Sequence, residues 1–290
     1  MNFFLRFRNL DRRIIYIFIA AAVVIPMFKP IGFKMVPGEY VRGLYSFVDA
    51  LPKGTRVFLS FDYDPAAQPE LHPAAIALLV HLFKKELRPV CGANWVMGGE
   101  LADSAITAAV EKIHGQGGES AKREIISGRD YANLGYKPGG IIQVKRIVAD
   151  FLGPFPVDCK GVSTANMEIF RNSDARRFAF SDFGLVVSFM SGNKGIEDYI
   201  YVSGDHKRPM ATACSSVTIP HVYTYMQTGQ LIGMIGGMPG AAEYETLIGM
   251  PGTATAGMDS QSMCHLVIIG FILLGNLVFL AERRIGGRQA

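Results

Sequence analysis

Cysteine is scarce in this sequence, with four in 290 residues. Cys91, Cys159 and Cys214 lie in the middle of the chain, so at most one disulfide can form there, and Cys264 lies in an apolar segment near the C-terminus. Their wide spacing excludes zinc knuckles, which need cysteines two to four residues apart. We interpret the cysteines as small buried hydrophobic residues.

Charge is also modest, at 19% of residues against 49% hydrophobic. Such a chain is too apolar to be disordered and too charged for a polytopic transporter. Internal repeats and low-complexity tracts are missing. The sequence therefore predicts one soluble domain of ordinary composition, joined to a few very apolar segments.

Two apolar segments without charged residues occupy positions 14–28 and 263–281. The second matches the length needed to cross a bilayer, and the first does so if it extends to residue 33. A buried core helix is the alternative for both. A cleaved signal peptide is a further alternative for the first, but no small-x-small cleavage site follows it. We predict a signal-anchor helix at 14–33 and a second transmembrane helix at 263–281.

Positive charge is concentrated at the two ends. Residues 1–13 carry four arginines against one aspartate, and residues 282–290 carry three arginines against one glutamate. The net charge of the whole chain is only +4, so residues 14–281 are slightly acidic. The positive-inside rule then predicts that both basic termini are cytoplasmic, with residues 34–262 extracytoplasmic. This distribution indicates topology in a cell membrane and gives no support to a nucleic-acid partner.

The middle of the chain alternates between strand-like and helix-like patterns. Residues 55–61 and 88–96 are apolar runs bounded by turn residues, and each precedes an amphipathic segment, at 72–87 and 99–114. Further apolar runs follow at 183–190 and 211–219, residues 35–50 are amphipathic, and 141–151 fits either a helix or a strand. The pattern predicts an α/β domain with a mostly parallel sheet in a three-layer, Rossmann- or flavodoxin-like sandwich.

Two acids follow the first predicted strand, Asp62 and Asp64. Ligands of open α/β sheets bind at the carboxyl ends of the strands, and alternate residues of an extended chain point the same way. The pair is therefore a candidate catalytic site and a candidate site for a divalent cation. In the alternative interpretation, Asp64 starts a turn and Asp62 caps backbone amides.

The D-x-D spacing at the end of a strand resembles the first motif of haloacid-dehalogenase-like phosphatases. The resemblance implies that Asp62 is a nucleophile and Asp64 an acid/base. The hydroxyl residue that the family has two positions beyond the second aspartate is replaced here by Ala66. Ser188 resembles the second motif of the family, and Lys194, Glu197 and Asp198 resemble the later ones.

A polar, glycine-rich stretch at 128–140 is predicted to be a loop. Loops supported by a rigid sheet often carry binding residues. The candidate ligand-binding residues are Arg129, Asp130, Tyr131, Asn133, Tyr136 and Lys137. The alternative is a long solvated connection.

Residues 228–252 are apolar and rich in glycine. Gly229, Gly233 and Gly237 recur at intervals of four and would form one stripe on a helix. We predict either a tightly packed core helix or a segment at the membrane surface.

Polar residues inside the second apolar segment favour assembly. Asn276 lies deep in the predicted span and His265 nearer its outer end, and an unpaired amide in lipid is costly. Because the first segment offers few polar partners, we predict a homo-oligomer or a membrane-protein partner.

Taken together, the sequence favours a membrane-anchored extracytoplasmic binding or assembly module, a subunit or scaffold of a membrane complex. The alternative function is an extracytoplasmic, metal-dependent, phosphatase-like hydrolase that uses Asp62 and Asp64. No cofactor is predicted besides a possible divalent cation.

Overall fold

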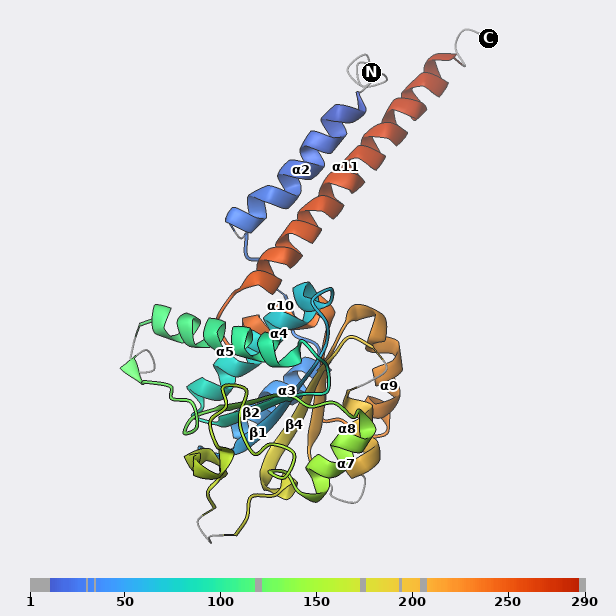
Figure 1. Cartoon of the computed structure of the whole chain (residues 1–290). Helices are drawn as coiled ribbons and strands as arrows, with labels where there is room; N and C mark the ends of the chain where they lie inside the picture. Colours follow the sequence, from blue (N-terminus) through green and yellow to red (C-terminus); the bar gives the residue numbers. More distant parts are fainter. Residues whose placement is uncertain are drawn as a thin grey trace. The chain divides into compact units, whose positions relative to one another are not determined.

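The structure is a computed structural model that describes residues 11–29, 31–33, 35–117, 122–172, 176–192, 195–203 and 208–286. The chain divides into two compact units (Figure 1). One unit contains residues 35–254, and the other contains residues 1–34 together with 255–290. The two units are described separately below.

The larger unit is built on a six-stranded, all-parallel sheet with the strand order β3-β2-β1-β4-β5-β6. Its strands are β1 (Arg56–Asp62), β2 (Arg88–Ala93), β3 (Ala132–Tyr136), β4 (Phe183–Met190), β5 (Met210–Cys214) and β6 (Gly233–Gly236). The central strands are buried along almost their whole length. Continuous apolar runs of this kind are expected where helices cover both faces of a parallel sheet. The predicted α/β class is confirmed.

Helices pack on both faces of this sheet. On one side, α4 (Gln68–Lys84) contacts α5 (Gly98–Gly115) and α10 (Gly237–Leu247), and α3 (Glu39–Ala50) contacts α10 and β6. On the other side lie α7 (Ile141–Ala149), α8 (Ile196–Ser203) and α9 (Ile219–Gln227). Short 3-10 turns are found at η1 (Thr164–Asn166), η2 (Glu168–Phe170), η3 (Phe180–Asp182) and η4 (Ser216–Thr218).

The core on the α7–α8 side is aromatic. Phe58 of β1 is fully buried and contacts the rings of Phe151, Phe180, Phe183 and Tyr199 at centroid distances between 5.4 and 6.3 Å. Ring pairs at such distances add to the stabilisation from buried area. This cluster packs β1 against the helices and loops on this face of the sheet.

Two sequence interpretations need correction. Residues 128–140 are not entirely loop, because 132–136 form edge strand β3 beside β2. Residues 231–242 form neither a single helix nor a membrane-surface segment: they contain edge strand β6 and the first part of α10. The glycine stripe is therefore divided among three settings. Gly229 and Gly237 have φ values of +71° and +58°, and Gly233 lies where a Cβ atom would come within 2.6 Å of the Leu44 nitrogen.

Other predicted elements agree more closely. The strand predicted at 183–190 has the same bounds as β4, and the strand predicted at 55–61 is β1, which begins and ends one residue later. Helix α4 begins at Gln68, four residues earlier than predicted, because Pro69 occupies its first turn, a position that proline favours. Residues 141–149, which fitted either element, are helical.

The smaller unit contains α2 (Arg12–Phe28) and all but the first two residues of α11 (Thr253–Gly286), and the two helices are antiparallel within it. Phe18 packs edge-on against Phe271, and the Ser260 hydroxyl donates to the Val23 carbonyl. The Asp259 carboxylate accepts hydrogen bonds from the backbone N–H groups of residues 31–33. One carboxylate therefore fixes the chain that follows α2 against α11.

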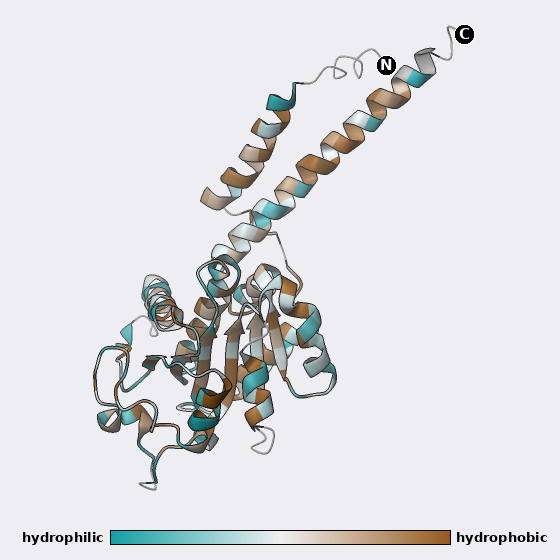
Figure 2. Ribbon diagram, turned by 45° about the vertical axis from the view of Figure 1, so that its right-hand side comes forward, coloured by the Kyte–Doolittle hydropathy of each residue, from teal (hydrophilic) through white to brown (hydrophobic). Residues whose placement is uncertain are grey.

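The helices of the smaller unit expose apolar side chains. In Figure 2, brown marks the hydrophobic residues along both ribbons. Of the described helices, one is long and apolar enough to cross a membrane, over Thr253–Ala281. This span begins ten residues before the predicted one. The 17-residue α2 is shorter, and its Pro26 lies in the last turn, near its end at Phe28.

Candidate functional site

A cavity of about 560 Å³ opens at the carboxyl ends of β1, β2 and β4. The described lining residues are Asp62, Asp64, Asn94, Trp95, Tyr136, Gly139, Gly140, Ser191, Gly192, Gly195 and Asp198. From β1 the chain continues to β2 and β3 on one side, and later to β4, β5 and β6 on the other. The point where the strand order reverses leaves a crevice between neighbouring loops, and ligands of parallel sheets bind there.

Asp62, the last residue of β1, is the most buried acid of this cavity, with 7% of its surface exposed. Its carboxylate accepts one hydrogen bond from the Asn94 backbone N–H at 2.9 Å and one from the Ser188 hydroxyl at 3.0 Å. The donors come from the strands on either side, because β2 and β4 both neighbour β1. The sheet itself therefore orients this carboxylate.

A second row of polar groups lies beneath Asp62. The Ser60 hydroxyl is 3.1 Å from the hydroxyl of Tyr199 on α8, which also accepts from the Asn94 side chain at 3.3 Å. The side-chain oxygen of Asn94 is buried and has no hydrogen-bond partner among the described residues. Buried polar atoms are rarely left without a partner, so this oxygen offers an acceptor for a ligand or a bound water.

Burial raises the pKa of Asp62 from 3.8 to about 6, and its hydrogen bonds offset this rise only in part. Among the described residues, no lysine or arginine forms an ion pair with it. A carboxylate kept in a costly environment inside a cleft is a frequent mark of a functional site.

The rest of the cavity is acidic and aromatic. Asp64 and Asp198 join Asp62 in the lining, and the described lining includes no lysine, arginine or histidine. One Asp64 oxygen accepts from the Ala67 backbone N–H at 3.1 Å, as the turn-capping alternative predicted. Trp95, which is 44% exposed, and Tyr136 supply aromatic surface. Carboxylates and ring faces in one pocket are both complementary to a positive charge.

The geometry of the cavity gives limited support to a metal site. No three histidine, cysteine, aspartate or glutamate side chains in the described part of the chain lie close enough to hold one ion. Of the other residues that carried the haloacid-dehalogenase resemblance, Ser188 contacts Asp62 and Asp198 lines the cavity. Glu197 instead pairs with His221 outside it. Lys194 lies outside the described residues.

Of the ligand-binding residues predicted at 128–140, only Tyr136 is in the described lining. Asp130 is buried, and its carboxylate accepts hydrogen bonds from the guanidinium groups of Arg123 and Arg129. Burial alone would raise the pKa of Asp130, but these hydrogen bonds and that of the Ile126 N–H lower it overall.

The other predicted residues of this stretch have structural contacts. Asn133 donates to the Gly99 carbonyl, which ties β3 to α5, and Lys137 lies 6.0 Å from the ring centre of Phe155. The Tyr131 ring packs edge-on against Phe83.

Sequence reasoning missed Asn94 and Trp95. Both follow β2, which neighbours β1, so the strand order was needed to bring them to Asp62. Trp95 is the only tryptophan of the chain. Its place just after the second predicted strand was the one local signal for it.

The predicted assembly residues Asn276 and His265 are both exposed on α11. Among the described residues, the structure gives the Asn276 side chain no hydrogen-bond partner, and α2 does not cover it. The expectation of a partner in the membrane stays a prediction.

Comparison of the chain with protein-family models, with curated proteins and with solved structures finds no match.

Proposed function

We propose that this protein is a two-pass, membrane-anchored binding module whose extracytoplasmic domain recognises a small organic cation. The domain has the doubly wound strand order of Rossmann-like three-layer folds, and its cavity lies at the position where such folds bind ligands. The observation that carries the proposal is the buried carboxylate of Asp62, which has no cationic partner among the described residues and lies at the base of an acidic, aromatic cavity.

The chemistry of the cavity favours an ammonium group over other ligands. Asp62, Asp64 and Asp198 repel phosphate and carboxylate groups. An ammonium ion gains from carboxylates and from the ring faces of Trp95 and Tyr136 together.

The alternative function is a metal-dependent hydrolase of phosphatase type. Two carboxylates at one strand end are the observation that favours it, because Mg²⁺ is often held by one or two carboxylates together with waters and substrate phosphates. In that case Asp62 and Asp64 would bind the cation.

The chain's single tryptophan lines the cavity, so its fluorescence tests both functions in the intact protein. With the full chain in detergent micelles, we expect benzylamine to change Trp95 emission saturably and benzyl alcohol to have no such effect. Asp64→Asn should weaken benzylamine binding by about tenfold or more, the range of one charge-assisted hydrogen bond.

Glu39→Gln removes the same charge from an exposed position on α3 outside the lining and should leave binding unchanged. A response to magnesium, manganese or calcium that is lost in Asp64→Asn, without one to benzylamine, would favour the hydrolase instead. No response to either kind of cation would refute both.

The proposal extends to assembly in the membrane. The exposed amide of Asn276 is stabilised in lipid when a second helix offers a hydrogen bond. We expect Asn276→Leu to weaken the free energy of association in bilayers by roughly 0.5–2 kcal/mol, which would appear as fewer crosslinked dimers or less co-purified partner. Leu277→Ala, an apolar change at the adjacent exposed position, is the matched control. Equal crosslinking in all three proteins would count against assembly through this residue.

A further inference from the structure

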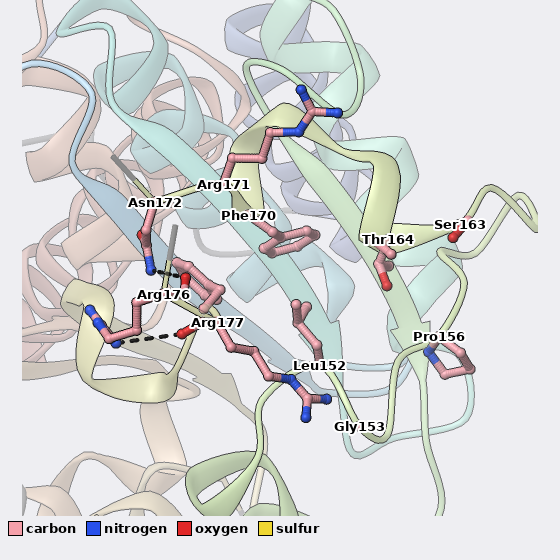
Figure 3. Close-up of a pocket in the computed structure, with 12 residues that line it drawn as sticks. Leu152, Gly153, Pro156, Ser163, Thr164, Phe170, Arg171, Asn172, Arg176 and Arg177 are labelled. Atoms are coloured by element: carbon pink, nitrogen blue, oxygen red, sulfur yellow. Dashed lines mark hydrogen bonds between the residues drawn. The ribbon is translucent and has the colours of Figure 1, made fainter. Parts of the chain in front are cut away.

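A second cavity, of about 740 Å³, lies in the segment between α7 and β4 (Figure 3). Its described lining comprises Leu152, Gly153, Pro156, Ser163, Thr164, Ala165, Phe170, Arg171, Asn172, Arg176, Arg177 and Phe178. Three of these residues are arginines and none is acidic. The charge is opposite to that of the cavity at Asp62, so the two cavities suit different ligands.

The wall that carries the arginines is held in place by Arg56, at the opposite end of β1 from Asp62. Its guanidinium donates to the carbonyls of Ile169 and Arg171 and to the side-chain oxygen of Asn172. It also lies 5.0 Å from the ring centre of Phe178. A half-buried guanidinium with this many partners fixes the backbone on which Arg171 stands.

The opposite wall is fixed as well. The Thr164 hydroxyl donates to the Phe155 carbonyl at 2.6 Å, and its backbone N–H donates to the Pro156 carbonyl at 3.1 Å. In Figure 3, the side chains of Phe170 and Leu152 lie between the wall that carries Arg177 and the wall that carries Thr164. The cavity therefore has pre-formed walls, an apolar interior and a cationic rim, which are the usual properties of a small-molecule site.

The three arginines are not equivalent. Arg176 is occupied by Asp182, which also accepts the Ala179 N–H and so belongs to the structure of the loop. Arg177 pairs with Asp150 at 3.0 Å, but both groups are largely exposed, and such pairs are weak. Among the described residues, no carboxylate lies within ion-pair distance of Arg171. Arg171 and Arg177 are thus the groups that a ligand can recruit.

We propose that this cavity binds a small amphipathic anion, a phosphate or carboxylate joined to an apolar group of aromatic size. Arginine pairs with either anion through two parallel N–H donors. The apolar part of the ligand would contact Phe170 and Leu152 while the anion meets Arg171 or Arg177 at the rim. This site is independent of the cation site at Asp62.

Calorimetric titration of the full chain in nonionic micelles, with empty micelles as blank, tests the proposal. Phenyl phosphate should bind at one site and more tightly than inorganic phosphate or benzyl alcohol. At least one of the variants Arg171→Gln and Arg177→Gln should weaken it about tenfold, which is the effect of losing one charge-assisted hydrogen bond. Both residues are exposed, so the variants should keep the parent's unfolding temperature.

Arg146→Gln, an exposed arginine on α7 outside the lining, is the matched control and should bind as the parent does. Trp95 lines the other cavity, so its emission should not respond to phenyl phosphate. Inorganic phosphate binding as tightly as phenyl phosphate would overturn the apolar part of the proposal. Undiminished binding to the double variant Arg171→Gln/Arg177→Gln would overturn the site itself.

Discussion

Asp62→Asn should make the protein more stable at neutral pH, by up to about 3 kcal/mol. An asparagine can keep both contacts, because its oxygen accepts from the Asn94 N–H and its amide donates to the Ser188 hydroxyl. What it removes is a negative charge buried without a cationic partner among the described residues. The buried charge destabilises the folded protein but is needed for the proposed binding site. Substitutions that raise stability and lower function are common in binding pockets.

The sign of the pH dependence follows from the raised pKa of Asp62. Below pH 3.8 the carboxyl is protonated in both the folded and the unfolded protein, so it costs nothing. Between 3.8 and about 6 the folded state binds more protons, and its stability falls as the pH rises. Above about pH 6 the Asp62 carboxylate is charged in both states, and its full destabilising effect remains.

Thermal unfolding at pH 4 and pH 8 measures this difference. For a domain of this size, 3 kcal/mol corresponds to a rise of about 5–10 °C in the unfolding midpoint at pH 8. At pH 4 the parent and Asp62→Asn should nearly coincide. Glu39→Gln should behave as the parent at both values. A variant that is less stable than the parent at pH 8 would mean that the Asp62 charge is compensated in the native protein.

Reporter fusions should give an all-or-none result for the proposed topology. A reporter active only outside the cytoplasm should be silent when it is fused after residue 290. It should be active when inserted at Gly161, an exposed turn position with a φ of +81° and free space around it. The reasons are the basic flanks, whose described part includes Arg12 and Arg13, and the antiparallel contacts of α2 with α11.

The opposite activities, or two active fusions, would contradict the two-pass arrangement. A reporter active only inside the cytoplasm, placed at the same two positions, is the control and should give the reverse pattern. This test matters most for α2, which is 17 residues long where roughly 20 are usual for a spanning helix.

The central strands could be predicted from the sequence because burial on both faces makes them continuous apolar runs between turn residues. β3 and β6 could not be, because both are short edge strands that contain glycine, as in the GMIG of β6. Their extended form depends on pairing with β2 and β5, which is a long-range effect. The same reason explains the misleading glycine stripe, whose members lie in a turn, in strand β6 and at the start of α10.

The pair of carboxylates on β1 and just after it was predictable in the same sense. Asp62 and Asp64 stand at the end of a strong strand, where local pattern and the general rule for parallel sheets agree. Ser188 and Asn94 reach Asp62 only because β4 and β2 both neighbour β1, and local sequence does not encode that order. Arg129 and Asp130 looked available for ligands, but they are partners of each other.

The pH dependence of benzylamine binding, followed by Trp95 emission, tests the proposed cation site most directly. The amine stays protonated from pH 5 to pH 8, whereas Asp62 loses its proton near pH 6. Affinity should therefore rise with pH through about 6 in the parent and become nearly independent of pH in Asp62→Asn. Binding that is the same at pH 5 and pH 8 in the parent, or a rise that persists in Asp62→Asn, would contradict the role given to this carboxylate.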